Sequence, residues 1–208
     1  MPTNGTLTCD IEQNKNLDTI VPDNKIQVTC TSFNCKGFKQ NVHFISKLLS
    51  TLDVVCLSET WLRPNELHVI HDTLSSSNEK ISVYTKSGMT EIDHCYKGRP
   101  YGRVAIICND VSNLSFYELN VDSDRIVAVA ACDDTGKIVQ VFISVYLLFY
   151  DGSQAQSDLF VTTLDALQSV IDEHGMSASV RIMGDFNVQL PRTSKLNCLW
   201  FRGKGFTS

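Results

Sequence analysis

The sequence predicts an α/β sandwich, in which two β-sheets pack face to face and helices cover the outside. Short apolar segments recur along the chain between turn residues, whereas only two segments show the apolar spacing of an amphipathic helix. Because strands outnumber helices, packing of sheet on sheet is favoured. The length of 208 residues suits one domain, which buries about 70% of the surface that its unfolded chain exposes.

The expected strands are apolar runs bounded by turn residues. IQVTCTSFN, at residues 26–34, is β-branched and alternating, and DVVCLSE, at residues 53–59, is almost continuously apolar. In chain order the expected strands are 26–34, 53–59, 81–85, 103–108, 113–119, 125–131, 138–147 and 179–184. The polar residues 1–25 are interpreted as a lead-in to a single domain that spans residues 26–208.

Two segments are predicted to be helices. Asn41 is expected to cap the first helix, because its side chain can accept from a free backbone N–H. The apolar residues on one face of this helix are Val42, Ile45, Leu48, Leu49 and Leu52. The second helix spans about residues 157–173. Its expected inner face consists of Leu159, Phe160, Thr163, Leu164, Leu167, Val170 and Ile171.

Composition excludes several classes of protein. The apolar fraction of 43% and the charged fraction of 20% are those of an ordinary globular domain. No apolar run approaches the ~18 residues of a membrane span, so no membrane association is expected. The first residues lack the basic and apolar blocks of a signal peptide, so reduced thiols and an intracellular location are expected. A net charge of −5 argues against coating of nucleic acid by electrostatics alone, but leaves open an enzyme whose acidic residues hold a divalent cation.

The eight cysteines and five histidines do not predict a zinc site. No CxxC pair occurs, and the histidines have no ligand spacing with the cysteines. Five cysteines lie in or beside apolar runs and are expected to pack as small hydrophobic residues. They are Cys30, Cys35, Cys56, Cys108 and Cys132.

Four of the expected strands end on polar side chains that are capable of catalysis. The first ends on Asn34, the second on Glu59, the seventh on Tyr146, and the last runs into Asp185 and Asn187. Each has an ordinary alternative: a turn former, a surface charge or helix cap, or a buried aromatic whose hydroxyl is satisfied. Together they indicate a site, because active sites in sheet-based folds gather at strand ends.

The segment RIMGDFN concentrates this signal. If the backbone stays extended, Asp185 and Asn187 point to the same side while Phe186 turns into the core. Gly184 allows a ligand or another backbone to come close. A simple strand-to-loop turn is the alternative, since Asp and Asn both satisfy loop backbone.

Five segments together resemble a known superfamily. TSFNCKG, CLSETWL, GRPYGRVAII, VFISVYLLF and RIMGDFN occur in the order of the endonuclease/exonuclease/phosphatase domain, over roughly residues 26–208. This resemblance implies a four-layer α/β sandwich of two packed mixed β-sheets flanked by helices. SETWL and GRPYGRVAI most resemble the endonuclease domain of non-LTR retrotransposon polyproteins, which implies a DNA substrate, a reverse transcriptase domain in the same polyprotein and a nuclear location.

The resemblance also implies roles for the residues at the strand ends. Glu59 would be the principal ligand of Mg²⁺, with Mn²⁺ as a substitute, and Asn34 would orient Glu59 and the scissile phosphate. Tyr146 would lie close to the phosphate. Asp185 would align or deprotonate the attacking water, and Asn187 would hold a phosphate oxygen or that water. A phosphodiester needs such a site, because its transition state concentrates negative charge on oxygen.

A second group is expected to bind substrate. Arg99, Tyr101 and Arg103 lie in the segment GRPYGRVAII, and further basic residues flank the expected site in sequence, which fits a phosphate backbone. A solvated surface of mixed charge is the alternative for these basic residues.

The chain departs from the family pattern in three places. Arg103 stands where the family usually has a second glycine, and Leu147 and Leu148 follow the tyrosine where a proline-containing loop is usual. The family completes its site with a final Asp-His pair, but no histidine follows Asp185. His71-Asp72 has the reversed order and is expected to lie in a surface loop. The chain is therefore expected to be a fragment that lacks the C-terminal strands.

Three functional hypotheses follow. The first is a Mg²⁺-dependent endonuclease that nicks DNA and leaves a 3′-hydroxyl. The second is a truncated, inactive remnant with at most weak binding of metal or nucleic acid. The third is a phosphatase of the same fold, which requires a pocket for a small head group.

Overall fold

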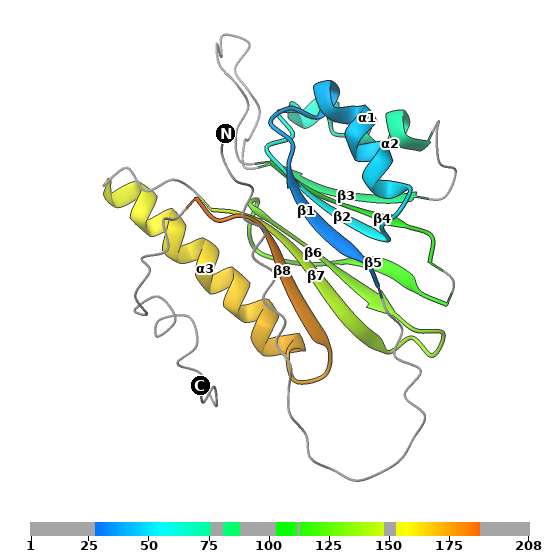
Figure 1. Ribbon diagram of the computed structural model, residues 1–208. Coiled ribbons are helices and arrows are strands. Elements are labelled where there is room, and N and C mark those ends of the chain that lie inside the picture. Colours follow the sequence, from blue (N-terminus) through cyan, green and yellow to red (C-terminus); the bar gives the residue numbers. More distant parts are fainter. Residues whose placement is uncertain (1–27, 76–80, 88–102, 112, 148–152, 188–208) are drawn as a thin grey trace, which may run out of the picture.

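A computed structural model describes residues 28–75, 81–87, 103–111, 113–147 and 153–187 and shows two four-stranded sheets packed face to face (Figure 1). The first sheet has the order β1 (Cys30–Asn34), β2 (Val54–Ser58), β4 (Arg103–Asn109), β3 (Ile81–Ser87). The second has the order β5 (Ser115–Leu119), β6 (Ile126–Cys132), β7 (Ile138–Tyr146), β8 (Ser179–Asp185). Each sheet combines one parallel pair with antiparallel pairs, so both are mixed, and the predicted fold class is confirmed.

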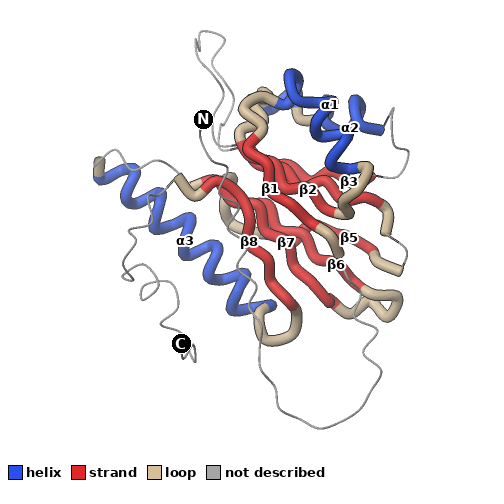
Figure 2. Tube along the Cα trace, viewed as in Figure 1, coloured by secondary structure: helices blue, strands red, loops and turns tan. Residues whose placement is uncertain are grey.

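Helices form the two outer layers (Figure 2). Helices α1 (Phe38–Leu49) and α2 (His68–Ser75) cover the first sheet, and α3 (Gln154–His174) covers the second. A short 3₁₀ helix, Pro64–Glu66, precedes α2. Within the described ranges, no helix is long and apolar enough to cross a membrane.

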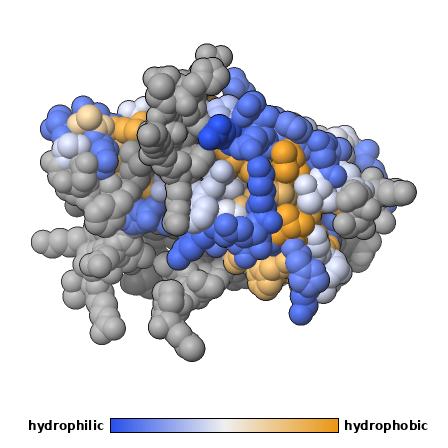
Figure 3. Space-filling model, turned by 90° about the horizontal axis from the view of Figure 1, so that it is seen from above, coloured by the Kyte–Doolittle hydropathy of each residue, from blue (hydrophilic) through white to orange (hydrophobic). Residues whose placement is uncertain are grey.

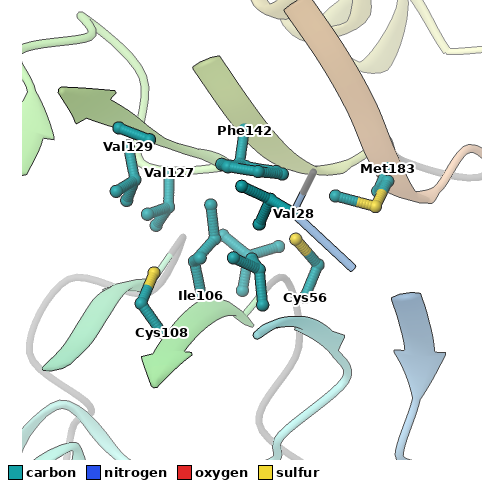
Figure 4. Close-up of a cluster of buried hydrophobic side chains, with 11 residues drawn as sticks. Val28, Cys56, Ile106, Cys108, Val127, Val129, Phe142 and Met183 are labelled. Carbon is teal, nitrogen blue, oxygen red and sulfur yellow. The ribbon is translucent and has the colours of Figure 1, made fainter. Parts of the chain in front are cut away.

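The central core fills the space between the sheets. In Figure 4, Val127, Val129 and Phe142 of the second sheet point toward Cys56 and Ile106 of the first. The buried members of this core are Val28, Val54, Cys56, Val104, Ile106, Cys108, Val127, Val129, Ala131, Phe142 and Met183. A second core lies between the first sheet and helices α1 and α2, and a third lies between the second sheet and α3. Four of the five apolar-run cysteines, Cys35, Cys56, Cys108 and Cys132, are buried, as expected of small hydrophobic residues.

Helix α1 begins four residues earlier than the sequence predicts. Its N-cap is Gly37, which has a φ of 106° that favours glycine. Asn41 lies inside the helix, so the prediction that it caps the helix is wrong. Its side-chain amide donates to the carbonyls of Cys35 (2.7 Å) and Gly37 (3.1 Å), and thereby fixes the loop that enters the helix. Ile45 is buried on the inner face, as predicted.

Helix α2 is absent from the sequence prediction, which placed His71-Asp72 in a surface loop. Both residues are exposed, but they belong to an eight-residue helix whose buried residues are Ile70 and Leu74. Three apolar residues in two turns, two of them adjacent, are too few to establish a period. In α3 the inner face is largely as predicted, except that Leu159 is exposed.

The parallel pairs carry the strand ends to one edge. In the first sheet β1 pairs with β2, and Asn34 is aligned with Ser58. In the second, β7 pairs with β8, and Tyr146 is aligned with Asp185. Gly184 permits this second pairing, because a Cβ at that position would lie 1.9 Å from the carbonyl oxygen of Val145. The predicted close approach at Gly184 is therefore that of another backbone.

Arg103, the first residue of β4, is the largest fully buried side chain, at 0% exposure. None of its three side-chain nitrogens has a hydrogen-bond partner among the described residues, and burial lowers its pKa to about 10. The guanidinium of Arg103 is enclosed by protein in this structure, and its contact with substrate stays a prediction. The long side chain occupies a position where the family pattern has glycine.

We expect Arg103→Met to stabilise the protein, because an apolar side chain of similar length replaces a buried cation whose guanidinium makes no hydrogen bond within the described residues. The free energy of unfolding in urea should rise by about 1–4 kcal/mol. Arg103→Lys keeps the charge and should give no such gain. A lower urea midpoint for Arg103→Met would show that the guanidinium has a stabilising partner.

Candidate functional site

The candidate site lies where the carboxyl ends of β1 and β8 meet at one end of the sandwich (Figure 1). The Nδ2 atom of Asn34, at the end of β1, donates to Oδ2 of Asp185, at the end of β8, over 2.8 Å. This hydrogen bond joins the two sheets. The space-filling view from above shows a described surface that is mostly hydrophilic, with a narrower hydrophobic strip (Figure 3).

Asp185 is held by groups from both sheets. Its Oδ2 accepts from Asn34, and its Oδ1 accepts from the backbone N–H of Asn187 at 3.1 Å. Burial raises the pKa of the Asp185 carboxyl, and the neighbouring Glu59 carboxylate raises it further, while the two hydrogen bonds act in the opposite direction. The net rise in pKa makes this carboxyl a better proton acceptor than an ordinary aspartate.

Asn187 reaches the site by a turn and not by extended backbone. Its φ is 44°, so the alternation that the sequence analysis assumed ends at Asp185. The Nδ2 atom of Asn187 donates to the carbonyl of Leu147 (2.8 Å), and Leu147 N–H donates to the carbonyl of Asp185 (2.9 Å). The turn after β8 therefore forms part of the site. Phe186 packs against the core between the second sheet and α3, which confirms the prediction that it turns into the core.

Glu59 follows β2 in a backbone conformation that is unfavourable for a residue with a side chain. Its φ is 54°, and that of Trp61 is also 54°. The carbonyls of Glu59 and Thr60 accept from the N–H groups of Gly37 and Phe38, each at 2.8 Å. These two bonds tie the loop after β2 to the start of α1 and hold Glu59 in this conformation.

Tyr146, at the end of β7, completes the group. Burial raises the pKa of its phenol, and the negative charges of Glu59 and Asp185 raise it further, while a hydrogen bond with Asn187 and the charge of Arg125 act in the opposite direction. At neutral pH the phenol therefore remains protonated and can donate a hydrogen bond to an anionic oxygen. The structure thus places all five strand-end residues in one neighbourhood.

Arg125 is a further candidate that the sequence analysis did not identify. It lies just before β6, is 4% exposed, and its carbonyl accepts from the N–H of Tyr146 at 3.0 Å. The only signal in the sequence is a basic residue directly before the apolar run IVAVAA. Arg99 and Tyr101, and the segments 1–25 and 188–208, lie outside the described residues.

The oxygen donors at the site suit Mg²⁺, which takes one or two protein carboxylates and keeps several waters. Glu59 and Asp185 approach each other closely enough for their charges to interact, and a cation between them would relieve that repulsion. Among the residues that the structure describes, no group of three His, Cys, Asp or Glu side chains has a metal-ligating arrangement. A closed zinc-type cage therefore does not fit this part of the chain.

We expect Asp185→Asn to raise the melting temperature by a few degrees at neutral pH in EDTA, because it removes a buried charge beside Glu59. A carboxyl whose folded-state pKa is raised loses stability as the pH rises from its ordinary value of about 4 through the raised value. The gain should therefore vanish at lower pH. Asp134→Asn, in an exposed turn, is the control, and an equal gain from it would contradict this account.

Solved structures share this fold at low sequence identity. The 3′ phosphatase NExo from Neisseria, bound to a product DNA hairpin, is 16% identical with a TM-score of 0.52, over 80% of this chain and 60% of that one. Zebrafish (D. rerio) TDP2, complexed with a single-strand DNA product, is 18% identical with a TM-score of 0.53, over 78% and 62%. The mannosyl-6-phosphatase Bt3783 of Bacteroides thetaiotaomicron is 16% identical with a TM-score of 0.52, over 84% and 70%.

Sequence comparison gives the family. No curated protein matches the chain. The family model described as Endonuclease/Exonuclease/phosphatase family matches residues 31–203, which include both sheets and all five strand-end residues of the site. Members of this family hydrolyse phosphodiesters or phosphate monoesters. The chain therefore belongs to the endonuclease/exonuclease/phosphatase family.

Proposed function

We propose that the chain is the hydrolytic domain of a Mg²⁺-dependent endonuclease that nicks DNA. The observation that carries the proposal is the hydrogen bond between Asn34 and Asp185, because it assembles a carboxyl of raised pKa and a second carboxylate, Glu59, at one edge. Two of the solved structures with this fold contain DNA products, which supports a nucleic-acid substrate.

Each residue has a role that follows from its contacts. Asp185 takes a proton from the attacking water, and Asn34 keeps its carboxylate oriented through the 2.8 Å bond. The phenol of Tyr146 donates a hydrogen bond to a phosphate oxygen. The hydrogen bond from Asn187 to the carbonyl of Leu147 fixes the side-chain amide of Asn187. This amide is thereby positioned beside the phosphate oxygen that Tyr146 contacts. Glu59 would hold Mg²⁺, or Mn²⁺ in its place, and a bound ion would supply a hard positive charge that stabilises the developing charge on phosphate.

The finer assignment is to a non-LTR retrotransposon, where the partner would be a reverse transcriptase domain of the same polyprotein and the location the nucleus. SETWL and GRPYGRVAI support it. A phosphatase is the second candidate, because Bt3783 and NExo, which share the fold, are phosphatases. The two candidates differ in substrate, so one preparation assayed on supercoiled plasmid and on a small phosphate monoester distinguishes them.

Mg²⁺ or Mn²⁺ should raise the melting temperature, because a ligand that binds only the folded state stabilises it, by about 2.7 kcal/mol at a hundred times the dissociation constant. Glu59→Gln should abolish this increment while the protein remains folded in EDTA. Glu118→Gln, on the exposed face of β5, should keep the increment in full. Equal increments in the two variants would remove Glu59 from the metal site.

We also propose that residues 1–208 alone nick plasmid slowly, because residues 186–208 contain no histidine to supply the family's final Asp-His pair. Loss of one preorganised group of this kind costs about 10²–10³ in rate. A longer reading frame that includes a Ser-Asp-His segment should restore nicking, and Asp185→Ala in that longer protein should abolish it. Robust, Glu59-dependent nicking by residues 1–208 would be the contrary result.

A further inference from the structure

Arg125 is a buried cation with free hydrogen-bond donors. Its side chain is 4% exposed, yet Nε and Nη1 find no hydrogen-bond partner among the described residues. The Asp124 carboxylate lies 4.0 Å from Nε, which is an ion pair but too long for a hydrogen bond. A buried guanidinium in this state is costly, because each unsatisfied donor has lost its water.

The guanidinium lies at the edge of the candidate site. In the β6–β7 ladder Ile126 is aligned with Val145, so Arg125 is directly opposite Tyr146 and projects to the same face. The backbone N–H of Tyr146 donates to the Arg125 carbonyl at 3.0 Å. Across β7, Tyr146 is aligned with Asp185. Arg125, Tyr146 and Asp185 therefore form one row along the second sheet.

The turn that carries Arg125 is fixed from both sheets. The hydroxyl of Ser123 accepts from the Arg125 N–H at 3.2 Å. Lys86, on β3 of the first sheet, donates to the carbonyls of Val121 (2.7 Å) and Ser123 (3.1 Å). The position of Arg125 is thus set before any ligand arrives, as a recognition residue requires.

We propose that Arg125 binds a non-bridging oxygen of the substrate phosphate beside Tyr146. A guanidinium presents N–H groups in a planar fork that matches the geometry of phosphate oxygens. Such an oxygen would satisfy donors that the described residues leave free, and the positive guanidinium would offset the negative charges of Glu59 and Asp185. This assignment rests on the proposed phosphodiesterase function.

Inorganic phosphate in EDTA is a suitable probe, because it needs no metal. The background is Glu59→Gln, which removes one neighbouring negative charge, and sodium chloride of equal ionic strength is the reference. We expect phosphate to raise the melting temperature of this background, and Arg125→Met to weaken the apparent affinity about tenfold to hundredfold. Arg125→Lys should be intermediate, since it keeps the charge but loses the fork.

The matched control is Arg181→Met on β8, where another partly buried guanidinium contacts the Val28 carbonyl and the Cys30 thiol away from the strand end. It should leave the phosphate effect unchanged. Equal phosphate effects with and without Arg125, or a loss of the effect in Arg181→Met as well, would overturn the proposal. Because the probe needs no metal, this result is independent of the Mg²⁺ test on Glu59, so failure of one proposal is distinguishable from failure of the other.

Discussion

The hydrogen bond from Asn34 to Asp185 is the one contact on which the geometry of the site depends. It joins residues that are 151 positions apart in the chain, at the ends of strands in different sheets. The apolar core between the sheets sets their spacing but gives no direction to a polar side chain. The parallel pairs β1–β2 and β7–β8 supply that direction, because they send the ends of four strands to the same edge.

The site is also where the chain gives up stability. Asp185 and Tyr146 are partly buried next to Glu59, and Glu59 itself has a left-handed backbone. Arg125 keeps donors that no described residue satisfies. None of these features favours folding by itself, and the apolar packing on either side must offset them. Such local costs are common at functional sites, where geometry is maintained by the surrounding structure. Arg103 is a further buried charge. Val104 is aligned with Ser58 in the β2–β4 ladder, so Arg103 lies opposite Glu59, yet its side-chain nitrogens make no hydrogen bond within the described residues.

The elements that the sequence predicts best are those that hold enough apolar residues to show a repeating spacing. All eight expected strands occur within a few residues of their predicted bounds, and α3 was found from the apolar spacing of its inner face. Helix α2 was missed because eight residues hold too few apolar positions. Asn41 shows a second limit: an asparagine before an apolar stripe suits a cap, but its amide instead binds the carbonyls of the preceding loop. Tertiary contacts of this kind have no signature in local sequence. The same holds for Arg125, which stands out because its buried guanidinium has donors that no described residue satisfies.

The contact between Gly184 and Val145 has a consequence for how such a sequence decays. Any residue other than glycine would place its Cβ 1.9 Å from a backbone oxygen, and the φ of 135° is one that residues with side chains rarely adopt. The clash is with main chain, so no rearrangement of side chains relieves it, and the β7–β8 ladder must open. Opening would separate Tyr146, at the end of β7, from Asp185, at the end of β8. In a gene that drifts without selection, a substitution at codon 184 would therefore mark a copy that has lost its site, even where every polar residue of the site is still encoded.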